Sequence, residues 1–189
     1  MVPKTLTTDT KEDRWALYQM GYEVARHGHP NVVTALGRLQ KLPGGPHDGP
    51  KRIFPVLYER LAYYYADNAD YEPFRNLLRQ HMLETWPLGI GDELLGQAVA
   101  ERKTHSILTA SRATGIDQRR LRKLLAAVNI VRDAESGLSD AWEVFDAELA
   151  KPILNELSTL VDAKAFASLI GATRSQFDRL VKDGVIKPE

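Results

Sequence analysis

One pattern occurs twice in this chain: a short helix, a glycine turn and a second helix, in residues 107–125 and again in residues 163–181. The copies align without gaps at a separation of 56 residues, and these positions match: Ala113 with Leu169, Gly115 with Gly171, Leu121 with Phe177, Leu124 with Leu180, and Ile130 with Ile186. Glycine suits the turn because it adopts positive φ without strain. The pattern is typical of a helix-turn-helix, whose second helix often enters the major groove of DNA. The repeat therefore predicts two such modules and nucleic acid as the ligand.

The charges of the chain are segregated, although 25 basic and 25 acidic side chains give a net charge of zero. Residues 101–125 carry seven basic groups against Glu101 and Asp117, a local net of +5. Residues 132–162 carry two basic groups against eight acidic ones, a local net of −6. This separation is expected when one face of a protein meets phosphate and another does not.

The composition excludes several classes of protein. With no cysteine, the chain has no disulfide, no thiol nucleophile and no cysteine-based zinc site. It begins with no apolar signal run, and no segment approaches the roughly 20 apolar residues of a membrane span. These features predict a soluble, cytoplasmic protein.

Residues 1–91 are predicted to form a helical amino-terminal region. Apolar residues recur at helical spacing in four segments: Trp15, Tyr18, Tyr22 and Ala25 in 11–27; Val32, Val33, Leu36 and Leu39, inward, in 31–41; Leu57, Leu61 and Tyr64 or Tyr65 in 54–66; and Phe74, Leu77, Leu78, His81 and Met82 in 73–85. Asn31 is a plausible cap for the second helix. The proline- and glycine-rich residues 42–50 indicate a loop.

The first winged helix-turn-helix is predicted to span residues 92–145. The secondary structure of residues 92–104 is ambiguous in the sequence, which is compatible with a helical turn at 92–95 followed by an extended stretch. The β-forming residues 129–132 and 141–145, separated by the loop 133–140, indicate a β-hairpin wing. Residues 146–189 then hold a linker helix, with Leu149, Ile153, Leu157 and Leu160 inward, and the second helix-turn-helix at 162–182. The fold class predicted is all-α and mainly helical, with tandem helix-turn-helix modules and a small wing.

The DNA-reading residues are predicted on the outward positions of each second helix. Asp117 and Thr173 are good N-caps for those helices. Arginine can form two hydrogen bonds with one guanine, and glutamine can do the same with adenine. Basic side chains also neutralise phosphate. The predicted DNA contacts are Arg112, Gln118, Arg119, Arg120, Arg122 and Lys123 in the first copy, and Arg174, Ser175, Gln176 and Arg179 in the second, less basic copy.

Other chemistry has little support in the sequence. His27, His29 and His47 have no carboxylate partners at a recognised metal-ligand spacing, and His81 with Glu84 is a single pair. There is no phosphate-binding glycine loop, dinucleotide fingerprint or nucleophile elbow. We therefore expect no catalytic residue, no metal, no cofactor and no enzymatic activity.

From about Phe54 onward the chain resembles the TniQ/TnsD family of transposon target-selection proteins. The residues that carry the resemblance are Tyr71–His81, the run Trp86-Pro-Leu-Gly, above all His105–Leu125, and in the second copy Gly171, Phe177, Leu180 and the run Gly184-Val-Ile-Lys-Pro. The resemblance implies an adaptor that recognises double-stranded DNA or a CRISPR effector complex and recruits an AAA+ regulator and the transposase.

The chain departs from that family in one respect. The amino-terminal region of the family usually carries zinc-binding Cys and His, and this chain has no Cys. It is therefore expected to be either a fragment of a longer protein or a reduced relative. The end at Glu189, where a second hairpin would begin at Val185, favours the fragment.

Two alternatives to the adaptor stay open. In one, the chain is a protein-interaction module whose helices dock on a partner through the aromatic amino-terminal half. In the other, it is a phage or plasmid helix-turn-helix regulator. The sequence leaves the DNA site undefined, and both a monomer and a homodimer are compatible with it.

Overall fold

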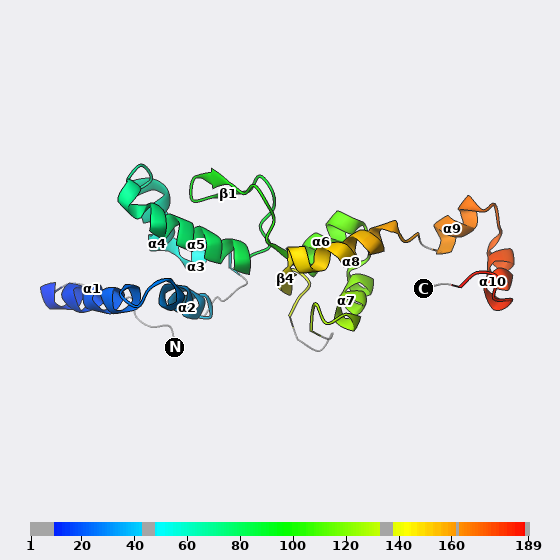
Figure 1. Ribbon diagram of the computed structural model, residues 1–189, viewed down its shortest axis with the longest axis horizontal. Helices are drawn as coiled ribbons and strands as arrows, with labels where there is room; N and C mark the ends of the chain where they lie inside the picture. The colour runs from blue at the N-terminus through cyan, green and yellow to red at the C-terminus, as the bar shows by residue number, and fades with distance from the viewer. Residues whose placement is uncertain (1–9, 43–47, 133–137, 162, 188–189) are drawn as a thin grey trace.

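The computed structural model describes residues 10–42, 48–132, 138–161 and 163–187. These residues form a mainly helical, elongated molecule with two small antiparallel sheets, so the predicted all-α, mainly helical class is confirmed (Figure 1). In chain order its helices are α1 (Lys11–Ala25), α2 (His29–Gln40), α3 (Pro50–Ile53), α4 (Pro55–Glu59), the π-helical turn η2 (Arg60–Tyr64), the 3₁₀ turn η3 (Ala69–Tyr71), α5 (Glu72–Thr85), α6 (Ile107–Thr114), α7 (Gln118–Ala127), α8 (Ala147–Thr159), α9 (Ala163–Leu169) and α10 (Arg174–Lys182). The strands are β1 (Glu93–Leu94), β2 (Gln97–Ala98), β3 (Thr104–Ser106) and β4 (Val144–Asp146).

Helix α1 extends from one end of the molecule and is followed by α2 after a short turn (Figure 1). It buries none of its side chains. Trp15, Tyr18 and Tyr22, which the sequence placed on one face, are all more than half exposed. The amino-terminal end of the molecule thus presents an aromatic helix face to solvent.

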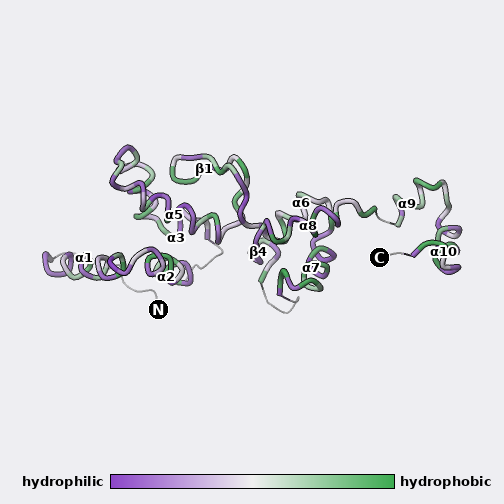
Figure 2. The backbone as a smooth tube through the Cα atoms, in the orientation of Figure 1, coloured by the Kyte–Doolittle hydropathy of each residue, from purple (hydrophilic) through white to green (hydrophobic). Residues whose placement is uncertain are grey.

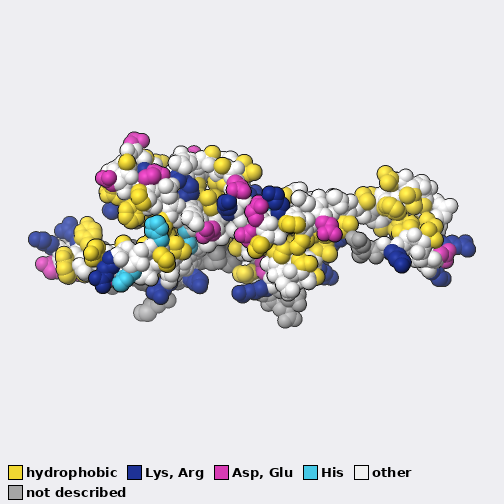
Figure 3. Space-filling model, viewed as in Figure 1, with side chains coloured by type: hydrophobic (Ala, Val, Ile, Leu, Met, Phe, Trp, Pro, Cys, Tyr) yellow, Lys and Arg dark blue, Asp and Glu magenta, His cyan; other side chains and the backbone are white. Residues whose placement is uncertain are grey.

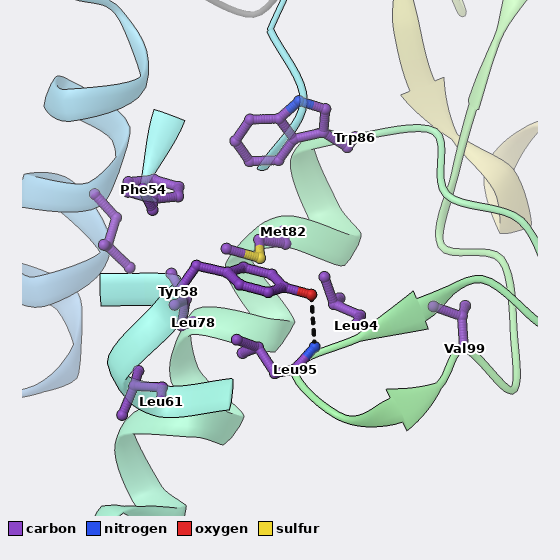
Figure 4. Packing of buried hydrophobic residues seen from close by; sticks show 10 residues of the cluster. Phe54, Tyr58, Leu61, Leu78, Met82, Trp86, Leu94, Leu95 and Val99 are labelled. Carbon is purple, nitrogen blue, oxygen red and sulfur yellow. Dashed lines mark hydrogen bonds between the residues drawn. The ribbon is translucent and has the colours of Figure 1, made fainter. Parts of the chain in front are cut away.

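The first hydrophobic core joins α2, α4, α5 and the β1–β2 hairpin. Tyr58, Leu78 and Met82 lie at its centre, and Figure 4 shows them converging with residues of the hairpin. The Tyr58 hydroxyl accepts a hydrogen bond of 3.1 Å from the backbone N–H of Leu95. Leu95 is buried although its φ is 51°, so its burial and this bond offset the strain of a left-handed backbone.

The second core is built from α6, α7, β4, α8 and the segment that follows α7. Ile107 and Leu121 are fully buried against Phe145, Ala150 and Leu154. Strand β3 pairs antiparallel with β4, which brings the segment before α6 next to the segment before α8. The α6–α7 pair is therefore closed by a strand and a helix that follow it in the chain.

Helices α9 and α10 pack against each other at the far end of the molecule (Figure 1). Gly171, at the turn between them, has a φ of 68°, and the Thr173 side chain caps α10. In contrast to α7, helix α10 buries none of its side chains. We call α6 with α7 the first helix pair and α9 with α10 the second helix pair.

The structure corrects several amino-terminal predictions. Helix α2 begins at His29 with Gly28 at its N-cap, so Asn31 is not the cap, and its residues Val33 and Leu39 are exposed rather than inward. The third helix begins at Pro50 and breaks at Phe54. It then buries Tyr58 and Leu61, whereas Leu57 and Tyr64 are exposed. Residues 92–95 contain strand β1 rather than a helical turn.

The predicted wing is also wrong. After α7, Asn129 takes a φ of 60° and the N–H of Ile130 bonds the Leu125 carbonyl oxygen, so this segment turns back. Val131 is then buried in the second core instead of lying in a strand. Strand β4 pairs with β3 instead, and its Phe145 side chain is buried in the second core. The wing loop at residues 133–137 lies outside the described residues.

Two further predictions near the carboxyl end are corrected. Helix α8 buries Ala147, Ala150, Leu154 and Leu157, while Leu149 and Leu160 face solvent. The predicted inward positions of Leu157, which is buried, and Ile153, which packs against the second core, are confirmed, and the stripe also includes small alanines that allow close helix packing. Residues 185–187 do not form a strand, and residues 188–189 lie outside the described part. In the described residues no helix is long and apolar enough to cross a membrane.

Candidate nucleic-acid interface

The first helix pair begins at a capped turn. The Ser106 side chain accepts a bond of 3.2 Å from the Thr109 N–H, and the Ser106 N–H donates to the Thr109 hydroxyl at 2.8 Å. This reciprocal capping box satisfies donors that the first turn of α6 would otherwise leave unpaired. Ser106 is also the last residue of β3, so the sheet fixes where α6 starts.

The turn between α6 and α7 has the geometry that the sequence predicted. Gly115 has a φ of 74°, and its N–H bonds the Ser111 carbonyl oxygen at 2.8 Å. Asp117 then caps α7, because its carboxylate accepts from the N–H groups of Arg119 and Arg120. The start and direction of α7 are therefore fixed by its own sequence.

The inner face of the pair is fully buried. Ile107 and Ala110 of α6 and Leu121 and Leu125 of α7 have no exposed surface. Figure 2 shows hydrophobic and hydrophilic residues alternating around the turns of α7. The burial of one face leaves the opposite face of α7 directed to solvent.

That outer face carries Arg119, Arg120 and Lys123, which are all exposed. They share one side of α7 because they lie at positions i, i+1 and i+4. Among the described residues, no carboxylate lies within ion-pair distance of these three cations. Arg112, near the end of α6, is likewise exposed, and Gln118 is half-buried.

Arg122 does not lie on this outer face, contrary to the prediction. Its side chain is only 10% exposed and pairs with Asp140 at 2.6 Å and with Glu143 at 2.7 Å. It also donates to the Leu138 carbonyl oxygen. Its guanidinium is thus held inside the protein and is not available to DNA.

Sequence reasoning missed this cluster of Arg122, Asp140 and Glu143. Burial by itself disfavours the charge of Arg122, but the hydrogen bonds with Asp140 and Glu143 outweigh it and raise the pKa of the guanidinium. The signal was the helical position, since Arg122 lies three residues before the buried Leu125 and next to Leu121. Two residues of the acidic segment 132–162, Asp140 and Glu143, therefore serve this internal pairing.

The same acidic segment is tied to the start of α6. The Asp140 carbonyl oxygen accepts from the Leu108 N–H at 2.8 Å, and that of Glu143 accepts from the Ile107 N–H at 3.3 Å. Arg122 therefore links α7 to a segment that is already bonded to α6. This arrangement holds the angle between the two helices.

The second helix pair presents a weaker cationic face. Arg174, Ser175 and Arg179 are exposed on α10, and Arg179 lies 3.9 Å from Asp183. The Gln176 side chain accepts from the Thr173 N–H at 2.8 Å in a capping box. Gln176, one of the α10 residues predicted to contact DNA, is therefore engaged in capping that helix.

The histidines do not form a metal site in the described part of the chain. No group of three or more His, Asp or Glu side chains gathers there in an arrangement that could hold a metal ion. His81 instead pairs with Gln40 through a contact of 3.0 Å between Nε2 and Oε1. His47 lies outside the described residues.

The site therefore consists of one capped, glycine-turned helix pair with an exposed cationic face. Comparison of the chain with protein-family models, with curated proteins and with solved structures finds no match.

Proposed function

We propose that the first helix pair is a helix-turn-helix that binds duplex DNA through the outer face of α7. The observation that carries this proposal is the placement of Arg119, Arg120 and Lys123. All three are exposed on one helix face whose opposite side is fully buried. A helix held in this way can enter a major groove without reorganising the core behind it.

The three cations have different expected roles. Arginine can bond the O6 and N7 atoms of guanine in pairs, so Arg119 and Arg120 can read bases. Lys123 and Arg112 fit the phosphate backbone, where a point charge is sufficient. The half-buried Gln118 lies at the start of α7, where a side chain first reaches the groove. Arg174, Ser175 and Arg179 would add a second, weaker contact.

A salt titration tests the proposal. We expect the chain to bind a labelled random-sequence duplex with an affinity that falls as salt rises. Replacing Arg119, Arg120 and Lys123 by alanine should weaken binding roughly tenfold or more, and should lower the slope of log affinity against log salt by about 0.9 for each removed cation that contacts a phosphate on this duplex. Fluorescence anisotropy at several salt concentrations measures both quantities.

The matched control is the variant Arg38→Ala, which removes one exposed cation from α2, far along the chain from the first helix pair. It should leave both the affinity and the slope nearly unchanged. Absence of binding at low salt, or equal effects of the control and of Arg119→Ala, would contradict the proposal. Thermal melting of each variant confirms that folding is retained.

We further propose that this DNA binding serves target-site selection in transposition. This step rests on the resemblance of His105–Leu125 and Tyr71–His81 to target-selection adaptors. In that role the protein would be cytoplasmic and non-enzymatic, and it would recruit an AAA+ regulator, a transposase or a CRISPR effector. Co-purification with the products of neighbouring genes tests it. A phage or plasmid regulator would instead bind an operator without such partners.

A second candidate function is supported by α1. Trp15 is 65% exposed, Tyr18 73% and Tyr22 61%. Exposed aromatic side chains on one helix face are typical of protein interfaces. The chain could therefore act as an interaction module through its amino-terminal half, and this function is compatible with DNA binding by α7. Loss of partner binding in Tyr18→Ser, with DNA binding retained, would support it.

A further inference from the structure

The two helix pairs differ in what covers them. In the first pair, β4 and α8 close the core, and Phe145, Ala150 and Leu154 lie against Ile107 and Leu121. In the second pair only Ala167 is buried, and the aligned aromatic Phe177 is half-exposed. The second pair thus lacks, among the described residues, the burial that β4 and α8 give to the first.

The positions left open in the second pair are apolar. Ala113 and Thr114 of α6 line one groove with Lys151 and Leu154 of α8. The aligned positions in the second pair are Leu169 and Ile170, which are 80% and 44% exposed. In the first pair Ala113 is itself exposed and Thr114 is half-buried, so the difference is that the second pair exposes two large apolar side chains at these positions.

The strand position shows the same contrast. Thr104 and His105 of β3 pair with β4, and the aligned residues are Leu160 and Val161. Leu160 has an extended backbone, and both side chains are exposed. Figure 3 shows hydrophobic side chains gathered over this end of the molecule. An extended apolar segment next to an open helix face is suited to receiving a strand followed by a helix.

Charge indicates the chemistry of the occupant. Residues 163–187 carry five basic and two acidic side chains, a net of +3. Residues 140–159, which cover the first pair, carry five acidic and one basic side chain, a net of −4. A hollow of about 670 Å³ in the second pair has Ala163, Ala167 and Phe177 on its apolar wall, with Lys164, Arg174 and Asp178 among its polar lining. A second copy of this basic pair would be repelled, whereas an acidic segment would be attracted.

We propose that the second helix pair binds an acidic strand-and-helix segment of a partner protein, seated as β4 and α8 are seated on the first pair. Small and aliphatic residues on the helix would pack against Leu169, Ile170 and Phe177. Its carboxylates would face Lys164, which lines the hollow. This docking uses the exposed apolar surface around Leu169 and Ile170 and does not depend on DNA binding by α7.

The test uses a peptide with the sequence of residues 139–160 as the probe, added to the full isotope-labelled chain. We expect saturable chemical-shift changes confined to residues 160–187, half-saturated at about 1 mM peptide or below. A peptide with the same apolar residues and lysine at every acidic position should bind roughly tenfold more weakly. Leu169→Asp should abolish the changes. Because Leu169 is exposed, this variant should keep its fold.

The matched control is Val56→Asp, which places the same charge at a site on α4 that is 60% exposed and outside the second pair. It should leave the titration unchanged. Absence of shifts in residues 160–187, or equal binding of the lysine peptide, would overturn the proposal. So would a concentration-dependent dimer of the free chain that Leu169→Asp dissociates, because the occupant would then be a second copy.

Discussion

At the scale of single residues, the first helix pair separates two roles among its arginines. Arg119 and Arg122 lie one turn apart on α7, but the first is exposed and the second is buried. Glu143, one partner of Arg122, is 5% exposed, so its charge depends on the pairing. A buried carboxylate that loses its cation is strongly destabilising, whereas an exposed arginine contributes little to stability.

This difference predicts opposite effects of two alanine substitutions. Arg122→Ala should lower the free energy of unfolding by about 3–5 kcal/mol, since it removes the ion pairs that the largely buried Arg122 side chain makes with Asp140 and Glu143. Arg119→Ala should change it by no more than about 0.5 kcal/mol but should weaken DNA binding. Urea denaturation measures the first effect and anisotropy the second.

The double variant Arg122→Ala with Glu143→Gln provides the control. Removing the carboxylate charge of Glu143 as well should restore part of the stability lost in Arg122→Ala, because the two residues contact each other and their effects are not additive. If Arg122→Ala proved as stable as the unmodified protein, the cluster would have no structural role.

At the scale of elements, the glycine turn sets the geometry of the first helix pair. Nothing lies within 4 Å of the position that a Cβ at Gly115 would occupy, so space does not limit a side chain there. Its φ of 74° does. Gly115→Ala should therefore destabilise the protein by roughly 1 kcal/mol through backbone strain alone.

Gly37 is the matched control, since it lies inside α2 and also has open space around its Cβ position. There the same substitution should stabilise the protein by roughly 0.5–1 kcal/mol, because alanine favours a helix interior over glycine. Thermal melting measures both variants. Equal effects of the two substitutions would contradict a special role for the turn.

The turns and caps of the two helix pairs could be predicted from the sequence because they depend on neighbouring residues. Gly115, Asp117 and Thr173 occupy the predicted positions for this local reason. Pairing between distant segments could not be predicted in this way. The choice of β3 as the partner of β4, and of Asp140 and Glu143 as partners of Arg122, depends on how the core closes.

The same limit applies to the inward faces. Leu149 was predicted to point inward because leucine is hydrophobic, yet the structure buries Ala150 in its place. Only the packing of α8 on α6 distinguishes these neighbours, and this packing uses small residues. The exposed cations of α7 were predictable, since they follow from the helical spacing of Leu121 and Leu125.

At the scale of the whole molecule, the two cores are joined at β3. The Thr104 hydroxyl donates to the carbonyl oxygens of Leu83 and Trp86, which end α5, while Thr104 itself pairs with Asp146 of β4. The aromatic amino-terminal part and the cationic helix pair are thus tied through a buried polar residue. A partner bound at one part would be held in a defined orientation to DNA bound at the other.

Two histidines near this junction have a pKa lowered from the ordinary histidine value of 6.5. Burial lowers the pKa of His81 in the first core. Burial, and then the nearby Arg102 guanidinium, lower the pKa of His105 on β3. Below pH 6.5 the unfolded chain therefore binds more protons than the folded one, so the free energy of unfolding falls as the pH falls. Above pH 6.5 both histidines are mainly neutral in either state and contribute little pH dependence.

We predict that His81→Gln reduces this acid sensitivity. Its stability should fall less steeply than that of the unmodified protein as the pH is lowered below 6.5, whatever its stability at neutral pH, because the group that gains a proton on unfolding is gone. Urea denaturation at a series of pH values measures the slope. The exposed His27, in the control His27→Gln, lies outside both cores and should leave the slope unchanged. An unchanged slope in His81→Gln would mean that the first core does not resist protonation, and that His105 or the carboxylates govern the acid limit of the fold.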